Sequence, residues 1–171
     1  HLDLRSCGSV RAFAAAVAAA GQPVGLLVNN AGTASPPDIF AVNFTHTALL
    51  TELLRPRLAA GRIINVSSSA HIKATEKDLF RGDAQQPSRA YAASKLALLL
   101  NSHQLRREGH DVHDVHPGLV WTPVMESTLP AFLRALLGRL SGAYCLRPRH
   151  AAAMIVGRAS ARCPGPDAQL W

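Results

Sequence analysis

The sequence predicts an α/β fold in which helices cover both faces of a doubly wound parallel sheet. The short apolar run at residues 24–28, without polar alternation, is typical of a strand buried on both faces, and residues 61–66 are predicted to be a further short buried strand. Longer segments with apolar residues at helical spacing alternate with these runs, and this alternation favours a parallel sheet. The 171 residues, 48% of them hydrophobic, suffice for one domain with a sizeable core.

The first predicted elements are a strand end, a helix and a strand. Residues 1–4 are expected to be the end of a buried strand followed by a turn. Ser9 is expected to cap a helix with apolar residues at helical spacing, and Gly21 to follow its last turn. The strand at 24–28 runs into the polar and small residues 29–32, where the backbone can approach a ligand closely.

A Pro-containing loop at residues 33–39 precedes a long predicted helix over about 40–58. Pro56 is expected to end or kink this helix early, because proline cannot donate to the helical hydrogen-bond ladder. Asn43 lies inside the helix, where a polar residue is as often simply exposed as functional. The next strand, 61–66, runs into a row of three serines.

The second half of the chain continues the alternation. Residues 70–87 are polar and predicted to be irregular, and a helix follows to about residue 107. Residues 131–140 are predicted to form a basic amphipathic helix, which would lie on a membrane surface or, as we prefer, cover a substrate cleft. A last helix at about 150–161 completes a single domain over residues 1–161, with a Pro- and Gly-rich tail at 162–171.

Tyr91 and Lys95 lie four residues apart in the predicted helix that follows residue 87. This spacing places two side chains on one helix face, about 5–6 Å apart at Cβ. An ammonium beside a phenol stabilises the phenolate, so the pKa of Tyr91 is predicted to fall from about 10 towards neutrality. Such a tyrosine serves as a general acid or base. On this motif alone, a chance pair on a surface helix stays an open alternative.

Candidate functional residues also follow three successive strands. Asn30 comes after the strand at 24–28 and Ser68 after the strand at 61–66. Pro117 and Gly118 come after a weaker predicted strand at 112–115. Since ligands of doubly wound sheets bind at the carboxyl ends of the strands, this coincidence favours a functional site over a chance tyrosine–lysine pair.

The chain is basic, with a net charge of +7 and a pI near 10.2. This charge raises the question of nucleic-acid or membrane partners, and a basic RNA-binding domain is one candidate function. The lysines and arginines are scattered singly or in pairs, however, without a long basic block. We therefore favour an ordinary solvated surface and no nucleic-acid partner. A basic cleft that attracts a phosphorylated cofactor is the second interpretation.

A metal site and a membrane span are not predicted. The three cysteines show no C-x-x-C spacing, and His110, His113 and His116 are not accompanied by carboxylate or thiolate ligands. No apolar run approaches the roughly 20 residues that span a bilayer. The start of the chain shows no signal-peptide pattern and begins abruptly with a histidine, so we expect the sequence to be part of something longer.

Five motifs of this sequence occur in the order found in one enzyme family. They are Asn29-Asn30-Ala31-Gly32, Asn43, Asn65-Val66-Ser67-Ser68, Tyr91-Ala92-Ala93-Ser94-Lys95, and His116-Pro117-Gly118 with Thr122. On these motifs the chain closely resembles the short-chain dehydrogenase/reductase family over about residues 2–125. The spacing from Ser68 to Tyr91 resembles the retinol-dehydrogenase-like branch. The resemblance implies a Rossmann-type fold and an NAD(P)-dependent oxidoreductase that interconverts an alcohol and a carbonyl.

The resemblance also implies roles for single residues. Tyr91 would exchange a proton with the substrate oxygen, while Lys95 would lower the pKa of Tyr91 and hold the nicotinamide ribose. Ser68 would orient the substrate oxygen, with Ser67 as the alternative. Asn43 would hold a water that links Lys95 to solvent. Besides Tyr91 and Lys95, the implied cofactor-binding residues are Asp3, Asn30, Ala31, Gly32, Pro117, Gly118 and Thr122.

Within that set, Asp3 would accept a hydrogen bond from the adenine amine. Asn30, Ala31 and Gly32 would line the cofactor cleft. Three further residues would wrap the nicotinamide, namely Pro117, Gly118 and Thr122. The implied cofactor is NADP or NAD. The implied substrate is a lipophilic alcohol or carbonyl, such as a retinoid or steroid.

The sequence departs from the family pattern in its first part. No two glycines are separated by a single residue, so the Gly-rich turn that seats a pyrophosphate on a helix N-terminus is absent from this sequence. We therefore expect a partial Rossmann-type sheet that lacks its first two strands. The connection from Gly32 to Asn43 is also short, and residues 112–115 carry a charge where the family is apolar.

These departures leave two interpretations of function open. The first is a truncated oxidoreductase with its catalytic half intact. The second is a catalytically inactive fragment that serves as a binding or scaffold module. A homo-oligomer, membrane association, and a cytoplasmic or endoplasmic-reticulum-associated location fit the first interpretation.

Overall fold

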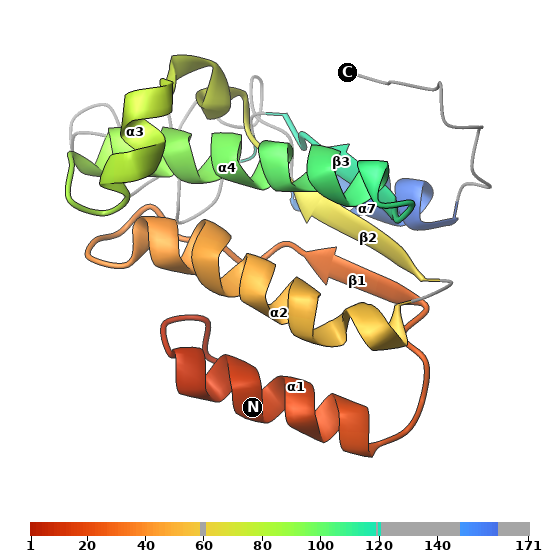
Figure 1. The fold of residues 1–171 in the computed structure, drawn as a ribbon. Helices are drawn as coiled ribbons and strands as arrows, with labels where there is room; N and C mark the ends of the chain where they lie inside the picture. Colours follow the sequence, from red (N-terminus) through yellow and green to blue (C-terminus); the bar gives the residue numbers. More distant parts are fainter. Residues whose placement is uncertain (59–60, 119, 121–147, 161–171) are drawn as a thin grey trace.

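The computed structural model describes residues 1–58, 61–118, 120 and 148–160, and a three-stranded parallel sheet lies at its centre (Figure 1). The strands are β1 (Leu26–Asn29), β2 (Arg62–Val66) and β3 (Asp111–Val115), in the order β1-β2-β3. Helix α1 (Cys7–Ala19) precedes the strands. Between the strands run α2 (His46–Leu54), α3 (Glu76–Arg81) and α4 (Pro87–Arg107), and α7 (Pro148–Ser160) follows β3. This arrangement confirms the predicted partial α/β fold.

The helices cover the sheet unequally. Figure 1 shows α2 and α4 in front of the sheet and α7 behind it, while α1 packs along α2. The front side holds the main apolar core, whose fully buried members include Val10 of α1, Ile63 of β2 and Leu105 of α4. Arg62 supports the rear helix, because its guanidinium donates to the carbonyl of Arg158 near the end of α7 at 2.7 Å.

Strand β1 is not buried on both faces, contrary to the sequence prediction. Leu26 and Val28 remain 42% and 37% exposed, whereas Leu27 of the opposite face packs against the core. The reason is tertiary: α7 packs against β2 and β3, and β1 forms an edge of the described sheet. An apolar run of four residues reports the hydrophobicity of a strand, not the number of faces that other elements cover.

The first residues also differ from the prediction, because residues 1–4 form no strand. The backbone groups here are used locally: Ser6 N donates to Asp3 O at 3.1 Å, and Asp3 N donates to Ser9 Oγ at 2.9 Å. Ser6, not Ser9, caps α1, and its Oγ accepts from Ser9 N at 3.2 Å. Gly21 does follow the last turn as predicted, with a φ of 74° that favours glycine.

The long helix predicted over residues 40–58 is built from three helical forms. A π-helical segment, Ala41–Thr45, precedes α2, and a 3-10 turn, Arg55–Arg57, follows it. Pro56 lies in that 3-10 turn, which confirms the predicted early end of the helix. At the start, the carboxylate of Asp83 accepts from the amides of Phe40 and Ala41 at 2.7 and 3.1 Å, supplying acceptors that the helix itself lacks.

The segment 70–87, predicted to be irregular, contains regular structure. A 3-10 helix spans Ser69–Lys73 and is capped by Ser68, and α3 follows. Thr75 and Asp78 form a capping box at the start of α3, a signal present in the sequence as T-E-K-D. The prediction of an irregular segment was wrong because short helices capped by polar side chains show little apolar periodicity.

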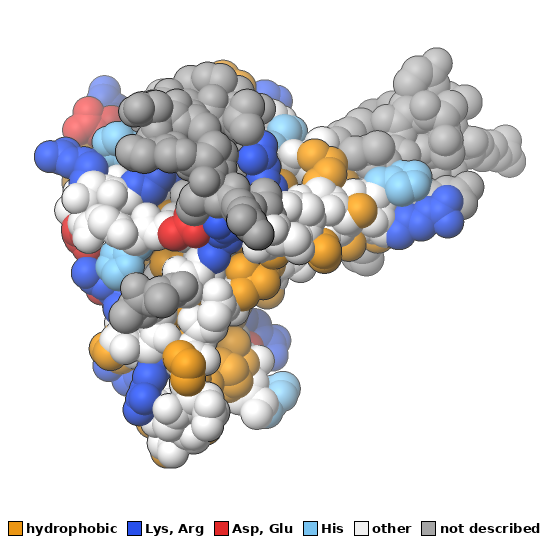
Figure 2. Space-filling view, turned by 90° about the vertical axis from the view of Figure 1, so that its right-hand side faces the viewer, with side chains coloured by type: hydrophobic (Ala, Val, Ile, Leu, Met, Phe, Trp, Pro, Cys, Tyr) orange, Lys and Arg blue, Asp and Glu red, His pale blue; other side chains and the backbone are white. Residues whose placement is uncertain are grey.

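The remaining sequence predictions concern the surface and the last residues. The strand at 112–115 and the last helix are confirmed as β3 and α7, whereas the amphipathic segment 131–140 and the tail lie outside the described residues. On the face in Figure 2, lysine and arginine side chains are spread around the molecule and do not form one patch. Within the described part of the chain, no helix is long and apolar enough to cross a membrane.

Candidate active site

Lys95 is a buried charged group at the carboxyl end of the sheet. Its side chain is only 6% exposed, and its Nζ donates to the carbonyl of Val66, the last residue of β2, at 2.7 Å. Burial in this position lowers the pKa of Lys95 to about 8, because the interior solvates an ammonium less well than water does. The helix α4 thus fixes a weakly basic amine at the end of a strand.

Tyr91 shares the α4 face with Lys95, as the four-residue spacing predicts. The Lys95 Nζ lies 5.8 Å from the centroid of the Tyr91 ring. The pKa of Tyr91 is nevertheless raised above 10, since partial burial of the phenol outweighs the opposite effect of its hydrogen bond with Ser68. The predicted lowering by Lys95 is therefore wrong for this structure, in which the ammonium binds the Val66 carbonyl.

The two serine candidates after β2 have different surroundings. Ser68 is half-buried, accepts from Ala70 N at 3.2 Å as the cap of the 3-10 helix, and hydrogen-bonds with Tyr91. Ser67 is buried, and its Oγ has no hydrogen-bond partner among the described residues. The structure brings Ser68 and Tyr91 together, whereas Ser67 lies apart from them. The geometry therefore supports Ser68 as the serine that would orient the substrate oxygen.

Asn43 is buried, with 2% of its surface exposed, so the alternative of a merely exposed polar residue is excluded. Its Oδ1 accepts from Thr33 N at 2.7 Å, and its Nδ2 donates to Thr33 O at 2.8 Å and to Ser94 Oγ at 3.2 Å. A Cβ added to Gly32 would lie 3.0 Å from Asn43 Oδ1 and 3.9 Å from Lys95 Nζ. Asn43 therefore ties the loop after β1 to α4, and only glycine fits between them without displacement.

We expect Asn43→Ala to lower the free energy of unfolding by about 2–3 kcal/mol, because it leaves buried backbone and hydroxyl groups without partners. Urea denaturation at neutral pH measures this loss. The control is Asn101→Ala on α4, where the side chain forms no hydrogen bond with the other described residues. Equal losses for the two variants would contradict a clamping role for Asn43.

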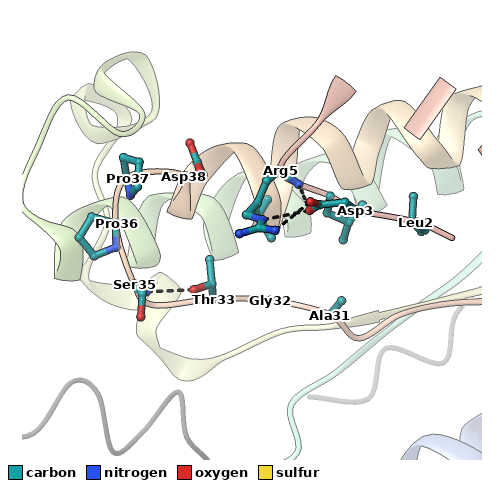
Figure 3. A pocket seen from close by; sticks show the side chains of 12 residues that line it. Leu2, Asp3, Arg5, Ala31, Gly32, Thr33, Ser35, Pro36, Pro37 and Asp38 are labelled. Carbon is teal, nitrogen blue, oxygen red and sulfur yellow. Dashed lines mark hydrogen bonds and ion pairs between the residues drawn. The ribbon is translucent and has the colours of Figure 1, made fainter. Parts of the chain in front are cut away.

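A pocket of about 480 Å³ lies between the start of the chain and the loop after β1 (Figure 3). Asp3, Ala31 and Gly32 all line it, so the structure brings together three of the predicted cofactor-binding residues. Figure 3 shows Arg5 beside Asp3, whose carboxylate accepts from Arg5 Nη2 and Nε at 2.9 and 3.1 Å. These bonds lower the pKa of Asp3, so its oxygens already have a cationic partner.

The other described residues that were predicted to bind the cofactor do not line this pocket. Asn30 is exposed at the end of β1, and Pro117 and Gly118 are half-buried after β3. Thr122 lies outside the described residues. Sequence reasoning missed Arg5, whose only signal is its position two residues after Asp3. In the described ranges, no three His, Cys, Asp or Glu side chains gather in a way that would hold a metal ion.

Comparison with known proteins decides the family. A family model described as short chain dehydrogenase matches residues 1–131. The chain belongs to the short-chain dehydrogenase family. Among curated short-chain dehydrogenases, it is 37% identical over 167 residues to bovine dehydrogenase/reductase SDR family member 13, covering 86% of this chain and 44% of that protein. It is 36% identical over 147 residues to human retinol dehydrogenase 13, covering 75% and 44%. These likenesses place it in the retinol-dehydrogenase-like branch.

Solved structures share this fold. The Pseudomonas aeruginosa RhlG/NADP active-site complex superimposes with a TM-score of 0.69 and 26% identity, covering 94% of this chain and 68% of that one. A Mycobacterium paratuberculosis protein superimposes with a TM-score of 0.68 and 28% identity, covering 96% and 59%. The chain spans less than half the length of the curated relatives that it matches.

Proposed function

We propose that this chain forms the proton-transfer side of an NAD(P)-dependent oxidoreductase site that interconverts an alcohol and a carbonyl. The observation that carries the proposal is the assembly of Tyr91, Ser68 and Lys95 at the carboxyl end of β2. The three side chains come from two segments that are separate in sequence, and they meet where ligands of parallel sheets bind. A chance tyrosine–lysine pair on a surface helix would not bury the lysine.

The residues present suit one half of a nicotinamide cofactor. Gly32 opens the approach to Asn43 and Lys95, and the adjoining pocket of about 480 Å³ has room for part of a nucleotide. For an adenine amine to reach Asp3, it would have to share the carboxylate with Arg5. This sequence contains no Gly-rich turn, which is the motif that the family uses to bind a pyrophosphate.

When bound, the cofactor supplies or accepts a hydride, and the chain supplies the proton and the orientation of the substrate. Tyr91 is protonated at neutral pH, because its pKa is raised, and its hydroxyl can donate to a carbonyl oxygen. Ser68 hydrogen-bonds the same oxygen and orients it. Lys95, with a pKa of about 8, is mostly charged at neutral pH and favours negative charge that develops on the Tyr91 oxygen.

The substrate that we propose is a lipophilic alcohol or carbonyl. The support is the naming of relatives: human retinol dehydrogenase 13, and mouse polyprenol dehydrogenase, which is 44% identical over 124 residues that cover 62% of this chain and 37% of that protein. A binding module without catalysis is the second candidate, favoured by the absent Gly-rich turn and by the engaged Asp3 carboxylate.

Binding of NADPH and NADH to this 171-residue chain tests the proposal. We expect saturable binding with a Kd in the micromolar range, followed by the fluorescence of the reduced nicotinamide. Gly32→Ala should weaken binding at least tenfold, because the added Cβ meets Asn43 Oδ1. The matched control is Gly25→Ala, where an added Cβ meets nothing within 4 Å. Absence of binding up to millimolar cofactor would contradict the proposal and favour the binding module.

A further inference from the structure

Three polar residues stand side by side across the sheet, near the carboxyl ends of the three strands. In the strand register Asn29 pairs with Asn65, and Asn65 pairs with Asp114. Side chains at paired positions of parallel strands point to the same face of the sheet. That face is the one covered by α2 and α4, since Asn29 Nδ2 donates to Thr51 Oγ1 of α2 at 3.1 Å.

Hydrogen bonds link this row from β1 to β3, and the link between β2 and β3 passes through Ser102 of α4. Asn29 Nδ2 donates to Asn65 Oδ1 at 2.8 Å, and Asn65 Nδ2 donates to Ser102 Oγ at 2.7 Å. The hydroxyl of Ser102 then donates to Asp114 Oδ1 at 2.6 Å. Ser102 is completely buried, so a lost partner here could not be replaced by bulk water.

The Asp114 carboxylate holds two successive turns of α4. One oxygen accepts from Ser102, and the other accepts from Arg106 Nη1 at 2.9 Å. Burial raises the pKa of Asp114. The contact survives protonation, because a protonated Asp114 can donate to Ser102 Oγ while Ser102 donates to the Leu98 carbonyl at 3.0 Å.

Ser102 lies on the α4 face that carries the proposed catalytic groups. It follows Lys95 by seven residues and Tyr91 by eleven, which are close to two and three helical turns. Lys95 binds the carbonyl of Val66, and Ser102 binds the side chain of the preceding residue, Asn65. Helix α4 is therefore attached to the end of β2 at two points about 10 Å apart along its axis.

We propose that Ser102 and Asp114 are positioning residues, which hold α4 on the sheet and thereby set the places of Tyr91 and Lys95. A helix packed only through alanines and leucines can shift along the sheet by small steps. The buried Ser102 hydroxyl must hydrogen-bond with both Asn65 and Asp114, and only one position of α4 along the sheet allows both bonds. As far as it concerns catalysis, this inference rests on the function proposed above.

The test uses the titration of Lys95, which needs neither cofactor nor turnover. The chain has three lysines, Lys73, Lys77 and Lys95, of which the first two are exposed, so NMR signals of labelled lysine side chains can be assigned with a Lys95→Met variant. We expect Ser102→Ala to move the pKa of Lys95 from about 8 towards the ordinary 10.5, as a loosened α4 admits water. A loss of global stability alone would not change the pKa of the folded state.

Asp114→Asn is the second variant, and it keeps the side-chain size if Ser102→Ala fails to fold. Loss of the negative charge would by itself lower the pKa of Lys95, so a rise reports a change in position. Asp111→Asn is the matched control, since Asp111 lies on the same strand and bonds Arg62 and His113, which lie outside α4. An unchanged Lys95 titration in the folded variants, or an equal change in Asp111→Asn, would overturn the proposal. Failure of cofactor binding would leave this result standing.

Discussion

Tyr91→Phe is expected to lower the turnover of this chain by about 10²–10⁴-fold, the usual contribution of general acid–base catalysis. The substitution removes the hydroxyl that would donate to the carbonyl oxygen and keeps the ring against which Lys95 lies. Cofactor affinity should therefore stay within about twofold of the unsubstituted chain. Single-turnover reduction of a retinoid aldehyde with NADPH measures the rate, and nicotinamide fluorescence measures the affinity.

The two adjacent serines provide a matched comparison for this experiment. Ser68→Ala should lower the same rate, because Ser68 hydrogen-bonds with Tyr91. Ser67→Ala should leave the rate nearly unchanged, because the Ser67 hydroxyl has no hydrogen-bond partner within the described chain. A Tyr91→Phe variant with unreduced turnover would refute the proposed proton donor. A larger loss in Ser67→Ala than in Ser68→Ala would exchange the roles of the two serines.

The free energy of unfolding is expected to rise by up to about 3 kcal/mol as the pH increases from 8 towards 10.5. The cause is Lys95, whose pKa is about 8 in the folded chain and near 10.5 when it is exposed. Below pH 8 both states carry the charge, and the folded state bears the cost of burying it. Between the two pKa values unfolding takes up a proton, so increasing pH opposes unfolding.

Tyr91 sets the upper end of this window. Its pKa is raised in the folded chain, so above pH 10 the unfolded chain loses the phenolic proton first and stability falls again. Urea denaturation at steps between pH 7.5 and 10 therefore measures the rise attributable to Lys95. Lys95→Met should abolish the slope, whereas Lys77→Met at an exposed position should preserve it. A flat profile in the unsubstituted chain would show that Lys95 is not buried as described.

Much of the fold follows from local patterns of the sequence. The short strands β1 and β2 and the long helix α4 can be predicted because strand and helix patterns depend only on near neighbours. The early end at Pro56 follows from the chemistry of a single residue. The prediction of a strand end at residues 1–4 is wrong because a strand needs a partner, and the sequence does not show whether one lies beside it.

The order of the motifs by itself predicted the family of the chain and most residues of the candidate site, but not Arg5. Only the tertiary structure decided how those residues behave. Asn43 is buried and hydrogen-bonded to Thr33 and Ser94. The pKa of Tyr91 is raised because the effect of burial outweighs the opposite effect of its hydrogen bond with Ser68. Hydrogen-bond partners and desolvation depend on groups brought together from distant parts of the chain, so no pattern of neighbouring residues encodes them.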